Sequence, residues 1–318
     1  MRRRSYLFPL SITDLGRRVK AQTSCDPHQF PHCGRFRPSL PLCQSQFPSD
    51  WISQRTCVVF CIKGEGKAAM RNPKDVGDDD IYDPQFVANL FDRCSSSYRR
   101  WSAISSFGFI SLWRYQCVNR LSPPAQTGSI AVDLMAGTGE VWSHLLRRFP
   151  DLGTITALDI SHKMHLEAVD RLHGKYAEMI THIEADALRT DLPSDYADLV
   201  ISTFGLKTFD RDQQSVLAKQ IARILKPGGS FALIEASDPK GWMLRPFYRF
   251  YLDRMLPQIE RFFLKGAKDF SMIGTYTRNF GDSTHMAEAL RAEGLSVTLK
   301  NHFFGCATSV AGYRPVKR

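Results

Sequence analysis

The chain has 318 residues and is 43% hydrophobic, which allows one large domain with an appendage or two small domains. It has no run of eighteen apolar residues, which argues against a membrane-spanning helix. The formal net charge of +10 suggests a nucleic-acid partner. Most of this charge, however, lies in residues 1–75, which hold thirteen Lys/Arg and five Asp/Glu. Because the remainder is nearly neutral and lacks a basic face, we expect no nucleic-acid partner.

Residues 1–76 form a basic stretch rich in proline and cysteine. Seven of the seventeen prolines and five of the eight cysteines lie there, without a helical or strand period. We predict a disordered extension in front of a folded domain spanning residues 77–318. Sparse cysteines in that domain favour a reducing cytoplasm. No metal is predicted, because one cysteine–histidine group in the extension has a spacing that matches no standard zinc site: Cys25, His28, His32 and Cys33.

The predicted domain begins with a block of helices at residues 86–121. Apolar residues at steps of three and four predict helices over 86–94, 98–105 and 109–121. Two consecutive prolines at 123 and 124 end the block. We expect it to cover the site as a helical lid.

Strands and helices alternate after this block. Strands are predicted at 130–134, 154–159, 197–203, 230–236, 296–303 and 308–314, with another that ends at 183–187. Helices are predicted at 140–149 and at 283–293, and within an insert at 240–275. Two more are predicted between them: one begins after Ser161 and includes Leu172, and one includes residues 216–225. A turn is expected at 226–229. This order predicts an α/β fold, a doubly wound and mostly parallel seven-stranded sheet with helices on both faces.

A glycine turn follows the first predicted strand. Gly137 and Gly139 let the backbone turn tightly and approach a ligand, which also faces the free N–H groups of the next helix. The second strand ends in Asp159, 26 residues after Asp133, a placement that suits a carboxylate binding a ribose diol. Asp186, after the third strand, is expected at the adenine edge.

The bound nucleotide is expected to be S-adenosylmethionine (SAM). A dinucleotide site needs a third glycine three residues after Gly139, and this chain has Trp142 there, too large for close packing under a pyrophosphate. SAM has no pyrophosphate, and its cationic sulfonium and ammonium groups favour nearby acids such as Asp133. The alternative is a plain α/β domain with an incidental turn.

Several short motifs occur in one order along the chain: Ser106-Phe-Gly108 with Trp113, Val132-Asp-Leu-Met-Ala-Gly-Thr-Gly139, Asp159-Ile160, Ala185-Asp-Ala187, Ser202-Thr-Phe-Gly-Leu206 and Leu225-Lys-Pro-Gly-Gly229. With these motifs, residues 86–313 resemble the ubiquinone/menaquinone-biosynthesis C-methyltransferases, a family of class I SAM-dependent methyltransferases. The glycine turn is common to many class I enzymes, whereas Ser-Phe-Gly and Phe-Gly-Leu are more particular to this family.

The resemblance implies that SAM is the cofactor and that the chain is a methyltransferase. Gly137 and Gly139 shape the turn. The residues that match the family's cofactor contacts are Thr138, Asp159, Asp186, Ala187 and Thr203.

The chain departs from the family where the family places polar groups toward its quinol. The family's Asn-Asp, His-Arg and Arg-Asn pairs, its C-terminal His and the Tyr of its insert are replaced, in that order, by Ser102-Ala103, Ile110-Ser111, Lys207-Thr208, Val310 and Phe270. We infer that the methyl donor is retained and the acceptor has changed, so quinols are expected to be poor substrates.

Two side chains remain as candidate catalytic groups. Lys207 stands where the family has an arginine, and as a cation it would steady an acceptor phenolate; the alternative is a solvated loop lysine. Tyr98 occupies a family position near the site, or else is a helix-surface aromatic. The insert is rich in aromatic residues, for which packing is the favoured role and a lid or a membrane-surface contact the alternatives.

The sequence therefore predicts a SAM-dependent methyltransferase that C-methylates a small apolar or aromatic, quinol- or phenol-like acceptor. It is expected in the cytoplasm, in contact with a membrane surface if the aromatic insert has that role. The alternative is a catalytically degenerate methyltransferase fold that acts as a partner in a biosynthetic complex.

Overall fold

The computed structural model describes residues 80–124, 127–172, 176, 178–263 and 272–316, and the structural statements below concern these residues. The expected extension of residues 1–76, the cysteine–histidine group within it, and Phe270 lie outside the described residues.

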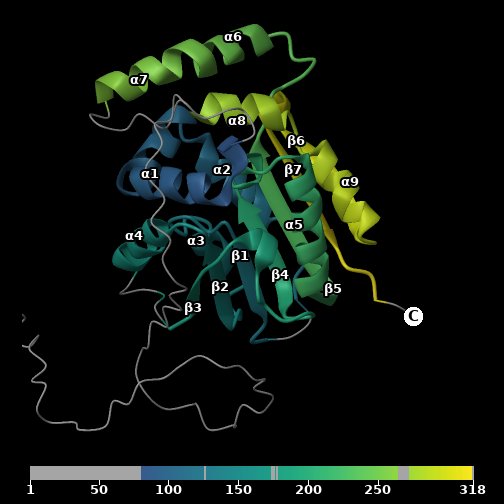
Figure 1. The fold of residues 1–318 in the computed structure, drawn as a ribbon. Coiled ribbons are helices and arrows are strands. Elements are labelled where there is room, and N and C mark those ends of the chain that lie inside the picture. The colour runs from purple at the N-terminus through teal and green to yellow at the C-terminus, as the bar shows by residue number, and fades with distance from the viewer. Residues whose placement is uncertain (1–79, 125–126, 173–175, 177, 264–271, 317–318) are drawn as a thin grey trace, which may run out of the picture. The chain divides into compact units, whose positions relative to one another are not determined.

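A seven-stranded sheet forms the centre of the fold (Figure 1). Its order is β3-β2-β1-β4-β5-β7-β6, in which the strands from β3 to β5 are parallel and β7 is antiparallel to both of its neighbours. This confirms the predicted fold class. The strands are β1 (Ile130–Leu134), β2 (Thr154–Asp159), β3 (Ile180–Glu184), β4 (Ala197–Thr203), β5 (Leu225–Ala236), β6 (Ser296–His302) and β7 (Ala307–Tyr313).

Helices cover both faces of the sheet, and each face has its own apolar core. Trp142 and Leu145 pack with residues of α2 and β1 on one face, and Leu217 and Met286 pack with β4 and β5 on the other. The helices are α1 (Pro84–Ser105), α2 (Phe109–Val118), α3 (Trp142–Arg148), α4 (His162–Leu172), α5 (Arg211–Ile224), α6 (Arg245–Phe250), α7 (Leu256–Phe263), α8 (Met272–Phe280) and α9 (Thr284–Ala292).

Helix α1 is one continuous helix where the sequence predicted two. The side chain of Asp83 accepts a hydrogen bond from the backbone N–H of Phe86 at 2.9 Å, and Pro84 occupies the first helical position. The three serines that interrupt the apolar pattern stay helical, and Ser95 is buried. The packing of α1 over the carboxyl end of the sheet therefore overrides the weak helix propensity of serine.

The insert after β5 differs from its prediction in two ways. Helices α6 and α7 are joined by one π-helical stretch, Tyr251–Met255, into a single rod, and α8 follows as a helix that the sequence did not predict.

The expected turn at 226–229 is also wrong, because β5 already begins at Leu225. A register shift against β4 and a left-handed Gly228 (φ 82°) accommodate these residues within the strand.

Candidate active site

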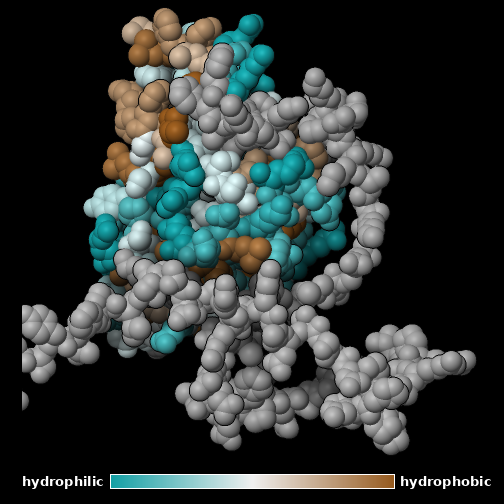
Figure 2. Space-filling view, turned by 90° about the vertical axis from the view of Figure 1, so that its left-hand side faces the viewer, coloured by the Kyte–Doolittle hydropathy of each residue, from teal (hydrophilic) through white to brown (hydrophobic). Residues whose placement is uncertain are grey.

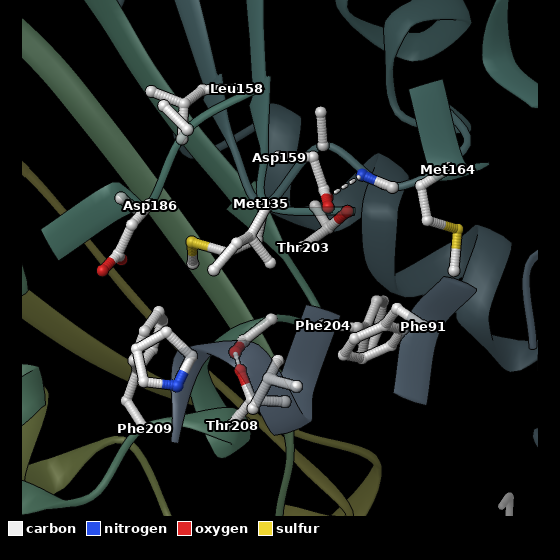
Figure 3. A pocket seen from close by; sticks show the side chains of 18 of the residues that line it. Phe91, Met135, Leu158, Asp159, Met164, Asp186, Thr203, Phe204, Thr208 and Phe209 are labelled. Atoms are coloured by element: carbon white, nitrogen blue, oxygen red, sulfur yellow. Dashed lines mark hydrogen bonds between the residues drawn. The ribbon is translucent and has the colours of Figure 1, made fainter. Parts of the chain in front are cut away.

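A cavity lies at the carboxyl ends of β1, β2 and β4, beneath α1 and α2. The space among its lining residues, counted together with the open mouth, is about 770 Å³. Figure 3 shows Asp159 and Asp186 on one side, with Phe91 and Phe209 across from them. The carboxyl edge of a parallel sheet is where ligands bind in folds of this kind.

The glycine turn supplies an open wall of this cavity. Gly137 has a left-handed backbone (φ 55°), lines the cavity, and has no atom within 4 Å of the position that a Cβ would take. Met135, before the turn, and Phe204, after β4, also line the cavity with φ values of 54° and 67°. Such angles are unfavourable for bulky residues, so backbone strain concentrates at this edge of the sheet.

Asp159 lies where the sequence placed it, at the end of β2, and lines the cavity. One carboxylate oxygen accepts the Gly137 N–H at 2.7 Å, and the other accepts the Ser161 N–H at 2.8 Å. Burial raises the pKa of this carboxyl, while His165 and the two backbone N–H groups oppose that shift. The carboxylate thus ties the glycine turn to the β2 loop, and its remaining lone pairs stay available at the cavity.

Three further predicted cofactor residues line the same cavity. Asp186 and Ala187 follow β3, and the Asp186 side chain accepts the Leu188 N–H at 2.9 Å. Thr203 ends β4. Together with Gly137 and Asp159, these residues line one space from four separate strand ends.

Thr138, Gly139 and Asp133 support the turn from below and do not line the cavity. The Thr138 hydroxyl donates to Glu140 Oε1 at 2.7 Å, and Gly139 packs on the Trp142 ring. Asp133 is fully buried and accepts the Trp142 Nε1–H at 2.8 Å, and burial raises the pKa of its carboxyl to about 8. The expected approach of Asp133 to the cationic groups of the cofactor is therefore corrected: this residue holds Trp142 in place under the turn.

Lys207 is not brought to the cavity. Its ammonium donates to Glu235 Oε1 at 2.8 Å and to the Phe204 carbonyl oxygen at 3.1 Å, and the Glu235 side chain is fully buried. Because the charge is neutralised inside the fold, the geometry gives Lys207 a structural role in place of the expected contact with an acceptor oxyanion.

Tyr98 does line the cavity, from α1. Burial raises the pKa of its hydroxyl far above the ordinary value, although the nearby Arg114 lowers it. At neutral pH Tyr98 is therefore an uncharged hydrogen-bonding group, unsuited to act as a phenolate base.

Arg114 and Glu140 are site residues that the sequence analysis missed. Both line the cavity, and Arg114 Nη2 donates to Glu140 Oε2 at 3.3 Å. The Arg114 guanidinium lies over the Phe204 ring, 5.4 Å from its centroid, and its buried Nε has no hydrogen-bond partner. The one available signal was the position of Arg114 directly after Trp113, a residue already marked by the family resemblance.

The set of substitutions that the sequence assigned to the acceptor is not gathered in one place. Among the members of this set that the structure describes, only Thr208 lines the cavity, and its hydroxyl donates to the Gly205 carbonyl oxygen at 2.7 Å. Val310 and Ile110 are buried in the two apolar cores, Ala103 is exposed, and the Ser102 hydroxyl donates to the Arg99 carbonyl oxygen. These four positions therefore do not form the acceptor lining that the sequence assigned to them, and they give no ground for expecting quinols to be poor substrates.

The residues present fit SAM by their own geometry. Gly137 leaves open space where a side chain would stand, a buried carboxylate stands at the end of β2, and Arg114 and Glu140 offer opposite charges at one end of the cavity. No described cluster of three or more His, Cys, Asp or Glu side chains is arranged to hold a metal ion.

Known proteins share this architecture. This fold is similar to that of a Haloferax volcanii methyltransferase solved with the Trm112 activator (TM-score 0.51, 17% identity, 71% of this chain and 98% of that one). It is also similar to that of a Haemonchus contortus phosphoethanolamine N-methyltransferase 2 solved with S-adenosylhomocysteine (TM-score 0.51, 14% identity, 71% of this chain and 60% of that one).

Sequence comparison goes further than the fold. Residues 79–314 match the model of the ubiE/COQ5 methyltransferase family. The demethylmenaquinone methyltransferase of Geobacillus stearothermophilus is 28% identical over 229 residues, which cover 72% of this chain and 96% of that enzyme. The Listeria monocytogenes serotype 4b enzyme of the same name is 28% identical over 232 residues (72% and 95%). The chain therefore belongs to the ubiE/COQ5 methyltransferase family and is a SAM-dependent methyltransferase.

Proposed function

We propose that this methyltransferase transfers a methyl group to a ring carbon of a small, quinol- or phenol-like aromatic acceptor. When bound, SAM would supply the methyl group and leave as S-adenosylhomocysteine, and the ring carbon would lose its proton to solvent. The support is the lining of the cavity, where aromatic and thioether side chains surround the uncharged hydroxyl of Tyr98 and two threonine hydroxyls, those of Thr203 and Thr208. The names of the bacterial relatives agree with an acceptor of this class.

The aromatic side of the cavity suits a flat apolar ring. Phe91, Phe204 and Phe209 line it, together with the thioethers of Met135 and Met164 (Figure 3). Such side chains hold an aromatic ring by packing and exclude water, so their contribution is to position the acceptor. Tyr98 is placed to share a hydrogen bond with an acceptor oxygen.

The charged end of the cavity suits the amino-acid tail of SAM, which carries an ammonium and a carboxylate. Glu140 is held by Thr138 of the glycine turn, and Arg114 faces Glu140 across the same end. A cation and an anion side by side complement a zwitterion, and each charge-assisted hydrogen bond is stronger than a neutral one. We therefore assign Arg114 to the carboxylate of the tail and Glu140 to its ammonium.

Arg114→Met is expected to weaken SAM binding by about 1.5–3 kcal/mol, the usual contribution of a hydrogen bond to a charged group. Isothermal titration of SAM into the purified protein measures the change. Arg120→Met is the matched control, because Arg120 bonds to Ser309 and Thr298 away from the cavity. We expect it to lower stability and to leave SAM affinity unchanged. Equal affinities of wild type and Arg114→Met would remove Arg114 from the tail.

The acceptor proposal is tested with methyl-labelled SAM and a short-tailed demethylmenaquinol analogue, alongside simple phenols. The product is expected to gain one methyl group on carbon, which carbon–proton NMR correlation distinguishes from a methyl group on oxygen. A methyl group found on oxygen would contradict the proposal. SAM binding without turnover of any acceptor of this class would favour the alternative of a non-catalytic partner.

A further inference from the structure

An exposed apolar face surrounds the loops above the cavity. We call it the aromatic face, and its members come from the α1–α2 turn, from the region of α6, and from the β6–β7 turn. Five of its side chains are more than half exposed: Met243 (85%), Phe107 (75%), Phe247 (73%), Phe304 (68%) and Phe250 (58%). Figure 2 shows apolar residues gathered in the upper part of the molecule, at the level of α6 and α7. A face of this kind on a folded protein marks an interaction site.

Ring contacts make this face continuous. The Phe107 and Tyr251 rings lie 5.3 Å apart between centroids, which joins the α1–α2 turn to the helical insert. Trp242, just before α6, stacks on Phe304 at 5.4 Å with an interplanar angle of 2°. Residues far apart in sequence thus meet on one surface.

The backbone beneath the face is strained. Phe303 and Phe304 are consecutive left-handed residues (φ 43° and 58°), and Phe107 is a third (φ 49°). Bulky L-residues rarely adopt these angles, and the three side chains are nevertheless 46–75% exposed. Because the fold gains little from exposing them, the strain points to a use of these rings outside the folded chain.

A ladder of aromatic rings connects the face to the cavity. Phe204 lines the cavity and lies 6.2 Å from Trp113 between centroids; Trp113 lies 5.8 Å from Phe109, and Phe109 lies 4.6 Å from Phe303 on the aromatic face. The aromatic face is therefore packed, ring against ring, on the wall of the cavity.

The segment that carries much of the aromatic face has a net positive charge. Residues 240–261 carry five basic side chains and two acidic ones, and Arg249 and Arg254 are exposed beside the apolar residues. This net positive charge complements an anionic surface. No helix in the described part of the chain has the length and apolar character to cross a bilayer, so the contact would be peripheral.

We propose that the aromatic face docks on the surface of an anionic lipid bilayer and holds the cavity next to an apolar acceptor dissolved there. The delivery of an acceptor rests on the proposed function, whereas docking does not. Phenylalanine, tryptophan and methionine enter the boundary between head groups and acyl chains, while the arginines meet the lipid phosphates.

Flotation of the full chain with lipid vesicles tests the docking. We expect the protein to float with vesicles of phosphatidylcholine mixed with phosphatidylglycerol, and to bind less at high salt. Phe247→Asn with Phe304→Asn should lower the bound fraction on the order of a hundredfold, about tenfold for each buried phenylalanine that is lost. Asparagine is chosen because it tolerates the left-handed backbone of Phe304. The control is Leu166→Asn on α4, an apolar side chain 46% exposed outside the face.

The docking is rejected if the double variant floats as well as the control, or if the full chain does not float with these vesicles. A double variant that loses a dimer in light scattering without any change in flotation would assign the face to a second copy and also overturn it. The basic residues before position 76 are present in every variant, so the difference reports the face alone. The SAM-induced rise in melting temperature and the turnover of a short-tailed, water-soluble acceptor should not change in the double variant. A failure of docking is thereby separated from a failure of the proposed function.

Discussion

Asp159→Ala is expected to reduce SAM affinity by at least about 1.5–3 kcal/mol, which is roughly 10- to 150-fold in the dissociation constant. The carboxylate lines the cavity, so its loss removes a charged partner from any ligand hydroxyl bound there. It also accepts the backbone N–H groups of Gly137 and Ser161, which become unpaired in the variant. Since Gly137 belongs to the glycine turn, the loss should loosen a second wall of the site. Calorimetric titration with SAM measures the affinity.

Asp198→Ala is the matched control for this experiment. Asp198 also accepts a backbone N–H, that of Ile130 at 2.9 Å, and it pairs with Lys226 at 2.8 Å. It stands at the opposite end of the sheet, where β1 and β4 begin, and does not line the cavity. Asp198→Ala should therefore lower stability and keep SAM affinity. An unchanged SAM affinity of Asp159→Ala would place the ribose elsewhere.

The fold and the placement of five of the expected cofactor residues at the cavity could be predicted from the sequence because their signals are local. Strand β1, Gly137 and Asp159 lie within 30 residues of one another in the sequence. The glycine allows a tight turn after one strand, and the aspartate stands at the end of the next strand. The parallel order of the strands then brings Asp186 and Thr203 to the same edge without further information.

The other half of the site depends on partners that the sequence does not reveal. Lys207 reads as a free loop cation until the fold places Glu235, 28 residues away, against its ammonium. Arg114 reads as a helix-surface residue until α2 turns it toward Glu140. In both cases a buried charge is set by tertiary pairing, which neither periodicity nor motif spacing encodes.

Helix boundaries were missed for a related reason. The three serines at 95–97 predict a break between two helices. Helix α1 nevertheless continues through them, because both of its halves pack on other elements. Leu225 reads as the last residue of a helix, and its pairing with Ala197 instead makes it the first of β5. Weak local propensity yields to packing at both places.

Gly139→Ala is expected to destabilise the fold by about 2–5 kcal/mol, combining a left-handed alanine with overpacking of the core. The backbone at Gly139 has φ 71°, and an added Cβ would stand 2.5 Å from the Trp142 ring. That ring cannot move aside easily, since it is fully buried and its N–H is held by Asp133. The free energy of unfolding in urea measures the loss.

Gly137→Ala makes the matched comparison two residues earlier. Its backbone is also left-handed (φ 55°), but nothing lies within 4 Å of the added Cβ, so only the backbone cost of roughly 1–2 kcal/mol applies. The new methyl group instead stands at the cavity wall, where it should obstruct SAM. We therefore expect Gly139→Ala to be the less stable variant and Gly137→Ala to lose more SAM affinity per unit of lost stability. Equal stabilities would show that Trp142 yields, and full SAM affinity in Gly137→Ala would move the cofactor away from the turn.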